Sequence, residues 1–143
     1  MAIQFVCIAS GQANKYDVGL ATAVDHFYKM QSKEDHETTF LKFETLSNTY
    51  PNEWLPPYYA AIVKARMSLL KMGDRDLIAD EAISWVARAK KNQLNDEVLC
   101  AESLVNSAKM SISPMRRWFS YESKIKTPLV LAKKINVNNP RIY

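Results

Sequence analysis

The chain is 143 residues long and 48% hydrophobic, which is enough for one well-filled core and argues for a single domain. Its three glycines leave little material for β-turns, so the composition favours an all-α fold over a β-rich one. The formal net charge is +4, and residues 53–143 hold fifteen of the nineteen Lys and Arg. A basic surplus suits acidic partners, but on a helical protein we interpret it first as a solvated face.

Residues 1–13 form a short apolar run that ends in small residues, as a secretory signal peptide does. The positive charges that normally open such a signal are missing. Two interpretations stay open. One is a signal remnant, which makes the protein exported or periplasmic, and the other is a buried N-terminal segment of a cytoplasmic protein. No other stretch is apolar for long enough to cross a membrane, and no insertion is expected.

The first half of the chain predicts three helices. Residues 14–30 carry large apolar side chains at spacings of three and four, which is one face of a helix. A second helix is expected from Ser32, whose hydroxyl can cap it, to the residue before Pro51, which is pushed out of the α region. The third, at 53–72, has prolines in its first turn, where they are tolerated, and Gly73 is expected to close it as the C′ residue.

The second half predicts three more. We expect a helix over 74–92, which Asp74 or Asp76 can cap, and another over 95–112, which starts at Asn95-Asp96-Glu97. A Ser-Pro pair then indicates a helix over 114–136, with proline in its first turn and an interruption at Pro128. Residues 139–143 resemble the start of a further helix.

The sequence repeats itself with a period of 43 residues. The Ala-Lys-Lys segment at 89–91 aligns with the same tripeptide at 132–134. A period of roughly 20–50 residues is typical of stacked helical hairpins. We therefore predict three antiparallel hairpins, at about 14–50, 53–93 and 95–137, in one repeat domain over 14–143. The small residues expected at close helix contacts are Ala60, Ala82, Ala89 and Ser103.

The second helix of each hairpin resembles the second helix of tetratricopeptide repeats, whose key positions follow one another at steps of four, three and five residues. The matching sets are Thr39, Phe43, Leu46, Pro51; Ala82, Val86, Ala89, Leu94; and Ile125, Leu129, Ala132, Val137. The period is about nine residues longer than the usual 34. The stretches EWLPPYYAA, SPM-x-RW and NNPRIY are similar to a bacterial subgroup of that family, often exported and without an assigned activity.

The resemblance implies a right-handed α-solenoid of about six helices, which binds a peptide or a partner protein on a concave surface lined chiefly by first helices. We therefore expect a non-enzymatic protein-binding scaffold, whose partner the sequence does not name. Counting helix faces from Ala60 and Ser103 places eight residues on the concave side. They are Trp54, Pro57, Ala61, Lys64, Glu97, Cys100, Leu104 and Ser107.

The alternative is a small α-helical enzyme or nucleic-acid-binding regulator that uses the basic C-terminal surface. The run of two arginines and two aromatic residues at 116–119 suits base stacking, although we expect Trp118 to fill a groove between hairpins instead. His36-Glu37 begins like a zinc-protease helix, but Phe40 stands where the second histidine is needed. We predict no catalytic residue, no metal site and no cofactor.

The last predicted helix has apolar positions that no further hairpin covers. They are Ile125, Leu129 and Ala132. Repeat arrays need a terminal cap with a polar outer face, and a large exposed apolar patch usually marks an interface. We expect self-association through this end, or a longer chain that covers it.

Overall fold

The computed structural model of the chain describes residues 3–143, with side chains from residue 15 onward. This part contains helices and no strand, so the all-α prediction is confirmed. The interpretation of residues 1–13 as a signal or a buried segment depends on side chains that lie outside the described ones. The elements are α1 (Ile3–Lys29), α2 (Lys33–Thr49), α3 (Leu55–Leu69), α4 (Arg75–Asn92), α5 (Asp96–Ser111), α6 (Pro114–Ile135) and the 3₁₀ turn η1 (Pro140–Ile142).

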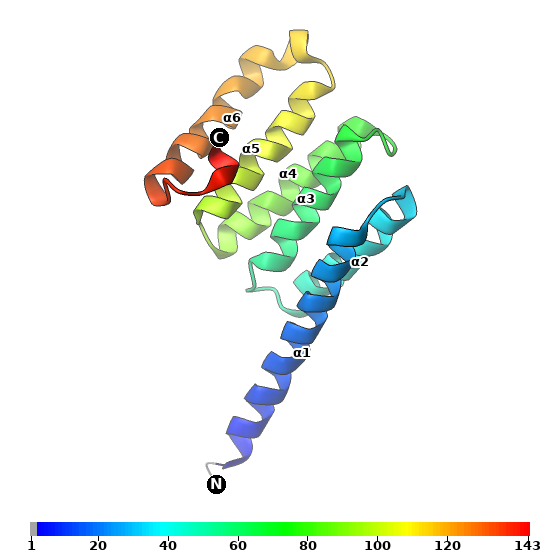
Figure 1. Cartoon of the computed structure of the whole chain (residues 1–143), viewed down its shortest axis with the longest axis vertical. Helices are drawn as coiled ribbons and strands as arrows, with labels where there is room; N and C mark the ends of the chain where they lie inside the picture. The colour runs from blue at the N-terminus through cyan, green and yellow to red at the C-terminus, as the bar shows by residue number, and fades with distance from the viewer. Residues whose placement is uncertain (1–2) are drawn as a thin grey trace.

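The six helices form a stack of antiparallel hairpins, α1 with α2, α3 with α4 and α5 with α6 (Figure 1). Neighbouring hairpins pack through α2 on α3, α4 on α5 and α3 on α5. The helix α1 is longer than its partner and extends beyond the stack (Figure 1). Among the described helices, none has the length and apolar character that crossing a membrane requires.

Most helix starts lie where the sequence predicted them, because local side chains satisfy the first N–H groups. Ser32 accepts from the backbone N–H of Asp35 at 3.1 Å, and the Asp35 carboxylate accepts from the Ser32 N–H at 2.8 Å. Asp74 caps α4, and Asn95 caps α5 through the N–H of Val98. These caps depend only on neighbours in sequence, so composition and spacing were sufficient to predict them.

The end of α3 differs from the expectation. Gly73 is not the C′ residue; the left-handed position belongs to Lys71, with φ of 59°. The N–H of Lys71 bonds the Ser68 carbonyl, and the N–H of Met72 bonds the Met67 carbonyl, which together form a Schellman motif. The helix therefore ends before the chain reaches Gly73. Gly73 instead turns the chain toward α4 in another positive-φ conformation.

The predicted interruption of the last helix at Pro128 is wrong. The helix α6 continues through Pro128 to Ile135. A proline inside a helix removes one backbone hydrogen bond and costs about 3 kcal/mol or more. Pro128 and Ala132, one turn later, are the buried residues of α6, and we attribute the tolerance to their packing.

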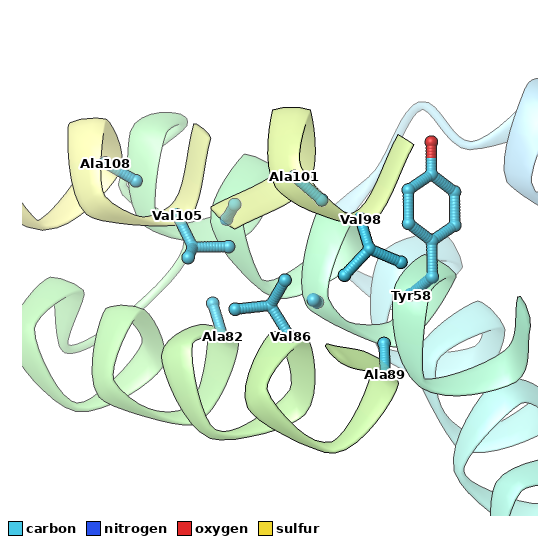
Figure 2. Packing of buried hydrophobic residues seen from close by; sticks show 10 residues of the cluster. Tyr58, Ala82, Val86, Ala89, Val98, Ala101, Val105 and Ala108 are labelled. Carbon is cyan, nitrogen blue, oxygen red and sulfur yellow. The ribbon is translucent and has the colours of Figure 1, made fainter. Parts of the chain in front are cut away.

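The main core lies between α3, α4 and α5 and consists largely of small residues. In Figure 2, α4 presents Ala82 and Val86 toward Val105 of α5, and Ala89 lies below Val98. Alanine and valine at facing positions let the helices approach closely. The burial expected from the repeat is confirmed, because each of the four predicted residues is at most 5% exposed: Ala60, Ala82, Ala89 and Ser103.

A second core joins α1, α2 and α3 around the fully buried Phe43. A third, smaller one lies between α5, α6 and η1. Here the expectation of an uncovered last helix is wrong for two positions. Ala132 is fully buried, and Leu129 packs against Leu99 and Cys100. Residues 136–143 fold back and place Ile142 on this cluster.

Three helices are joined by one charged cluster. The Lys109 ammonium of α5, which is largely buried, pairs with Asp76 and Asp80 of α4 at 2.8 and 2.7 Å. Arg117 of α6 pairs with Asp76 at 2.7 Å. The hydrogen bonds from Arg117 and Lys109 hold the pKa of the Asp76 carboxyl far below its usual range. These acids therefore link helices in addition to any role in capping or solubility.

Candidate functional site

A cavity of about 410 Å³ opens on the face shared by α1, α3 and α5. We call it the aromatic pocket. Its volume lies within the roughly 300–1,000 Å³ of small-molecule sites. Four aromatic rings, three aliphatic side chains, one thiol and one guanidinium line it. They belong to Phe27, Tyr28, Tyr58, Tyr59, Ile62, Cys100, Ala101, Leu104 and Arg141.

The tyrosine pair at the start of α3 forms the centre of the pocket wall. Adjacent residues of a helix point about 100° apart, so the two rings have different neighbours. Tyr59 is held between Phe43, stacked at 5.0 Å, and Phe27, edge-on at 5.1 Å. Tyr58 points toward α5 and donates its hydroxyl proton to Glu97 at 3.0 Å. Both rings are thereby fixed before any ligand arrives.

The end of α1 contributes two neighbouring rings that differ in their exposure. Phe27 is half-buried against the second core, whereas Tyr28 is 73% exposed at the mouth of the pocket. The two rings meet edge-on at 5.4 Å. On the opposite wall, Cys100 and Leu104 lie one turn apart on α5. Tyr28 is thus the aromatic side chain of the pocket that has the most surface available to a ligand.

A polar cluster forms the rim between α3, α5 and η1. Glu97 accepts from Tyr58, from the Asn139 amide at 3.0 Å and from the Arg141 guanidinium. Asn139 is buried, and its Nδ2 also donates to Asp96 at 2.9 Å. One carboxylate therefore connects the pocket tyrosine to the segment that carries Arg141.

Burial raises the pKa of three polar groups of the pocket, which belong to Tyr58, Tyr59 and Cys100. Desolvation, followed by the charge of Glu97, raises the pKa of the Tyr58 hydroxyl and of the Cys100 thiol. Desolvation also raises the pKa of Tyr59. Tyr58 and Tyr59 therefore remain neutral hydrogen-bond donors to a higher pH than an exposed tyrosine does. Within the described side chains, no group of three His, Cys, Asp or Glu is placed to hold a metal ion.

Three of the eight residues predicted for a concave binding surface lie at the aromatic pocket. Cys100 and Leu104 line it, and Glu97 lies at its rim. Ser107, one turn further along α5, is half-buried and donates its hydroxyl to the Ser103 carbonyl. On α5 three of the predicted residues thus lie at the pocket, and their role in binding a partner stays a prediction.

On α3 the face count is displaced. Ala61 and Pro57 are buried, and Trp54 packs against the main core. Lys64 turns toward α2 and α4, where it pairs with Glu81 and lies 4.0 Å from the Phe40 ring centroid. The pocket takes Tyr58, Tyr59 and Ile62 from this helix instead. The counting assumed that the concave side lies beside Ala60, whereas Ala60 is itself buried in the second core.

Sequence reasoning missed most of the pocket residues, although one signal was present. Phe27-Tyr28 and Tyr58-Tyr59 are aromatic doublets, and a helix can bury both members of a doublet only with difficulty, since they point about 100° apart. The second ring of a doublet is therefore a candidate for a surface or pocket. Nothing in the sequence indicated Arg141, which reaches the pocket by the return of residues 136–143.

A second hollow, of about 460 Å³, lies between α1 and α2. Its walls include three threonines and Lys42, and most of its lining side chains are exposed to solvent. It is a groove in the surface with no ring and no buried charge to orient a ligand. The aromatic pocket is therefore the better candidate.

The run of arginines and aromatics at 116–119 does not pack as expected. Trp118 was predicted to fill a groove between hairpins, and it is 46% exposed. Phe119 is 90% exposed. Arg117 is committed to Asp76, whereas Arg116 is exposed. The alternative of a nucleic-acid-binding surface at this run stays a prediction.

Comparison with known proteins agrees with the class of fold, which is all-helical with stacked hairpins. No protein-family model matches the sequence, and no curated protein matches it. Among solved structures, the chain resembles the HusA haemophore from Porphyromonas gingivalis with a TM-score of 0.71 and 22% sequence identity. The match covers 92% of this chain and 63% of the haemophore chain. At this identity the likeness shows the fold.

Proposed function

We propose that this chain is a non-enzymatic binding protein whose aromatic pocket holds a flat, largely apolar ligand of the tetrapyrrole class, such as haem. The observation that supports this proposal is the lining of the pocket, in which four rings from α1 and α3 face aliphatic side chains of α5. A solved structure of the same fold is named a haemophore, which supports this ligand class. In this proposal haem is the cargo that the protein binds and releases, and not a resident cofactor.

The chemistry of the pocket walls suits such a ligand. A macrocycle presents two apolar faces, and aromatic rings gain about 0.5–1.5 kcal/mol per pair from stacked or edge contacts beyond area burial. Phe43 and Phe27 already hold Tyr59 in place, so little conformational entropy is lost on binding. Leu104 and Ile62 add apolar surface on two different helices.

Titration of the protein with haem, followed by absorbance and by quenching of tryptophan fluorescence, tests the proposal. Leu104→Glu places a charge in the pocket and is expected to weaken binding by about 100-fold or more, since an unpaired buried charge is costly. Tyr28→Ala, which removes the exposed ring, is expected to weaken it by about 3- to 10-fold. Leu94→Glu is the control, because Leu94 is exposed in the α4–α5 loop outside the pocket. Equal binding by Leu104→Glu and Leu94→Glu refutes the proposal.

A second candidate keeps the expectation from the tetratricopeptide resemblance, in which the same face binds a peptide of a partner protein. It is favoured by the position of Cys100 and Leu104, which were predicted for such a surface and line the pocket. In this case an apolar side chain of the peptide occupies the pocket. Selection from a displayed peptide library separates the candidates. Enriched peptides that lose binding with Leu104→Glu, together with no haem binding by the parent protein, favour a peptide partner.

A further inference from the structure

Arg141 is the one cation among the residues that line the aromatic pocket, and the fold places it there with some precision. Asn139 is the cap of η1, where its side-chain oxygen accepts from the Arg141 N–H at 2.9 Å. Its amide nitrogen donates to Asp96 and Glu97 of α5. Ile142 packs on the third core. The backbone on both sides of Arg141 is therefore anchored without help from the guanidinium.

The guanidinium of Arg141 has more N–H donors than the described residues use. Arginine carries five N–H donors in a planar fork. Among the described side chains, Glu97 alone accepts from it, and the bond uses Nη1. The Arg141 side chain is 58% exposed, against 29% for Glu97. The carboxylate of Glu97 thus orients the guanidinium from the protein side and leaves its other edge to the pocket mouth.

We propose that Arg141 recognises a carboxylate at the edge of the bound ligand, so that the aromatic pocket selects flat apolar acids over their neutral esters. This inference rests on the proposed function and names its ligand class more narrowly. An arginine fork binds a carboxylate through two parallel hydrogen bonds, which adds geometry to charge. The apolar walls hold the body of the ligand, and Arg141 determines which edge lies at the rim.

A purely structural role for the ion pair is the competing explanation. In that case Arg141 serves to tie residues 136–143 to α5. The amides of Asn136 and Asn139 already make that tie, at 2.8 to 3.0 Å from Asp96 and Glu97. Removing the guanidinium therefore leaves the segment in place, which allows ligand recognition and folding to be measured separately.

The test compares two metal-free tetrapyrroles, protoporphyrin IX and its dimethyl ester, by fluorescence titration in the same detergent buffer. The full chain is expected to bind the diacid about tenfold more tightly than the diester. Arg141→Gln is expected to lose about tenfold for the diacid and nothing for the diester, and Arg141→Lys to lose part of that preference. Arg116→Gln, which removes an exposed arginine of α6, is the matched control and is expected to change neither affinity.

Each outcome is decisive. Equal affinity of the full chain for acid and ester overturns the inference while the proposed function stands. No loss in Arg141→Gln, or a loss that is the same for both compounds, overturns it as well, and a lowered unfolding midpoint then assigns Arg141 a structural role. If neither compound binds, or if both bind Leu104→Glu unchanged, the proposed function fails and the inference with it.

Discussion

Ala89 shows how a single small side chain determines the distance between two helices. It is fully buried in the main core, where α4 faces α5 (Figure 2). Its equivalent 43 residues later, Ala132, is also fully buried. The repeat therefore places alanine where two backbones approach each other and leaves no room for a branched side chain.

Replacement of Ala89 by Leu is expected to lower the free energy of unfolding by about 1–3 kcal/mol, because added methylene groups force neighbouring helices apart. Ala87→Leu is the matched control. Ala87 lies two residues away on the same helix and is exposed, so its replacement is expected to change stability by less than about 0.5 kcal/mol. Urea denaturation of both variants measures the difference. Equal stability of the two variants contradicts close packing at Ala89.

The helix α3 ends in a left-handed backbone conformation at a residue that disfavours this conformation. Lys71 occupies the left-handed conformation that costs a residue with a side chain roughly 1–2 kcal/mol. Gly73 lies two positions later and does not replace Lys71 in the left-handed conformation. Its own backbone adopts a different positive φ. A Cβ on Gly73 would lie 3.1 Å from Ile78 Cδ1. The chain thus needs two unusual conformations in three residues to reach α4.

Lys71→Gly is expected to raise the free energy of unfolding by about 1 kcal/mol, since glycine adopts positive φ without steric cost. Lys71 is exposed, so little packing is lost with its side chain. Lys71→Ala also removes the long side chain but keeps the backbone strain, and it is expected to stay within about 0.5 kcal/mol of the parent protein. Thermal unfolding of the three proteins makes the comparison. A gain shared by both variants shows that the lysine side chain, and not its backbone conformation, is responsible.

At the scale of the molecule, α6 exposes several large apolar side chains although the helix packs against α5. Met115 is 93% and Phe119 90% exposed, and Val130 and Ile135 are also exposed. Of the positions predicted to be exposed, Leu129 and Ala132 pack against α5 instead, and Ile125 is half-buried. An exposed apolar surface of this kind usually marks an interface.

We expect the protein to self-associate through this exposed surface of α6, with an increase in sedimentation coefficient as concentration rises. Phe119→Glu is expected to reduce the association, because it places a charge where two copies meet. Leu94→Glu, at an exposed apolar residue of the α4–α5 loop, is the control. Leu129→Glu is expected to unfold the end of the molecule instead, since Leu129 packs on the third core. A parent protein that is strictly monomeric at all concentrations contradicts the predicted self-association.

Periodicity, caps and small-residue repeats determined the helices of this protein from sequence alone. These signals are local: Ser32 needs only Asp35 to cap α2, and the spacing of apolar residues needs only the helix itself. The 43-residue repeat also predicted which alanines are buried, because each copy meets the same kind of neighbour. Two local predictions failed. The break at Pro128 is absent, where Pro128 is buried, and the helix end expected at Gly73 is formed by Lys71 instead.

The aromatic pocket was decided by the tertiary structure. Its walls come from α1, α3 and α5, and the angle between hairpins determines which side of each helix faces it. A rotation of about 100° separates Ala61, in the core, from Ile62, in the pocket, and no local signal specifies that angle. Arg141 depends on the return of residues 136–143 over α5, through amide contacts with residues about 40 positions earlier. Local sequence determined the helices, and contacts between distant segments determined the site.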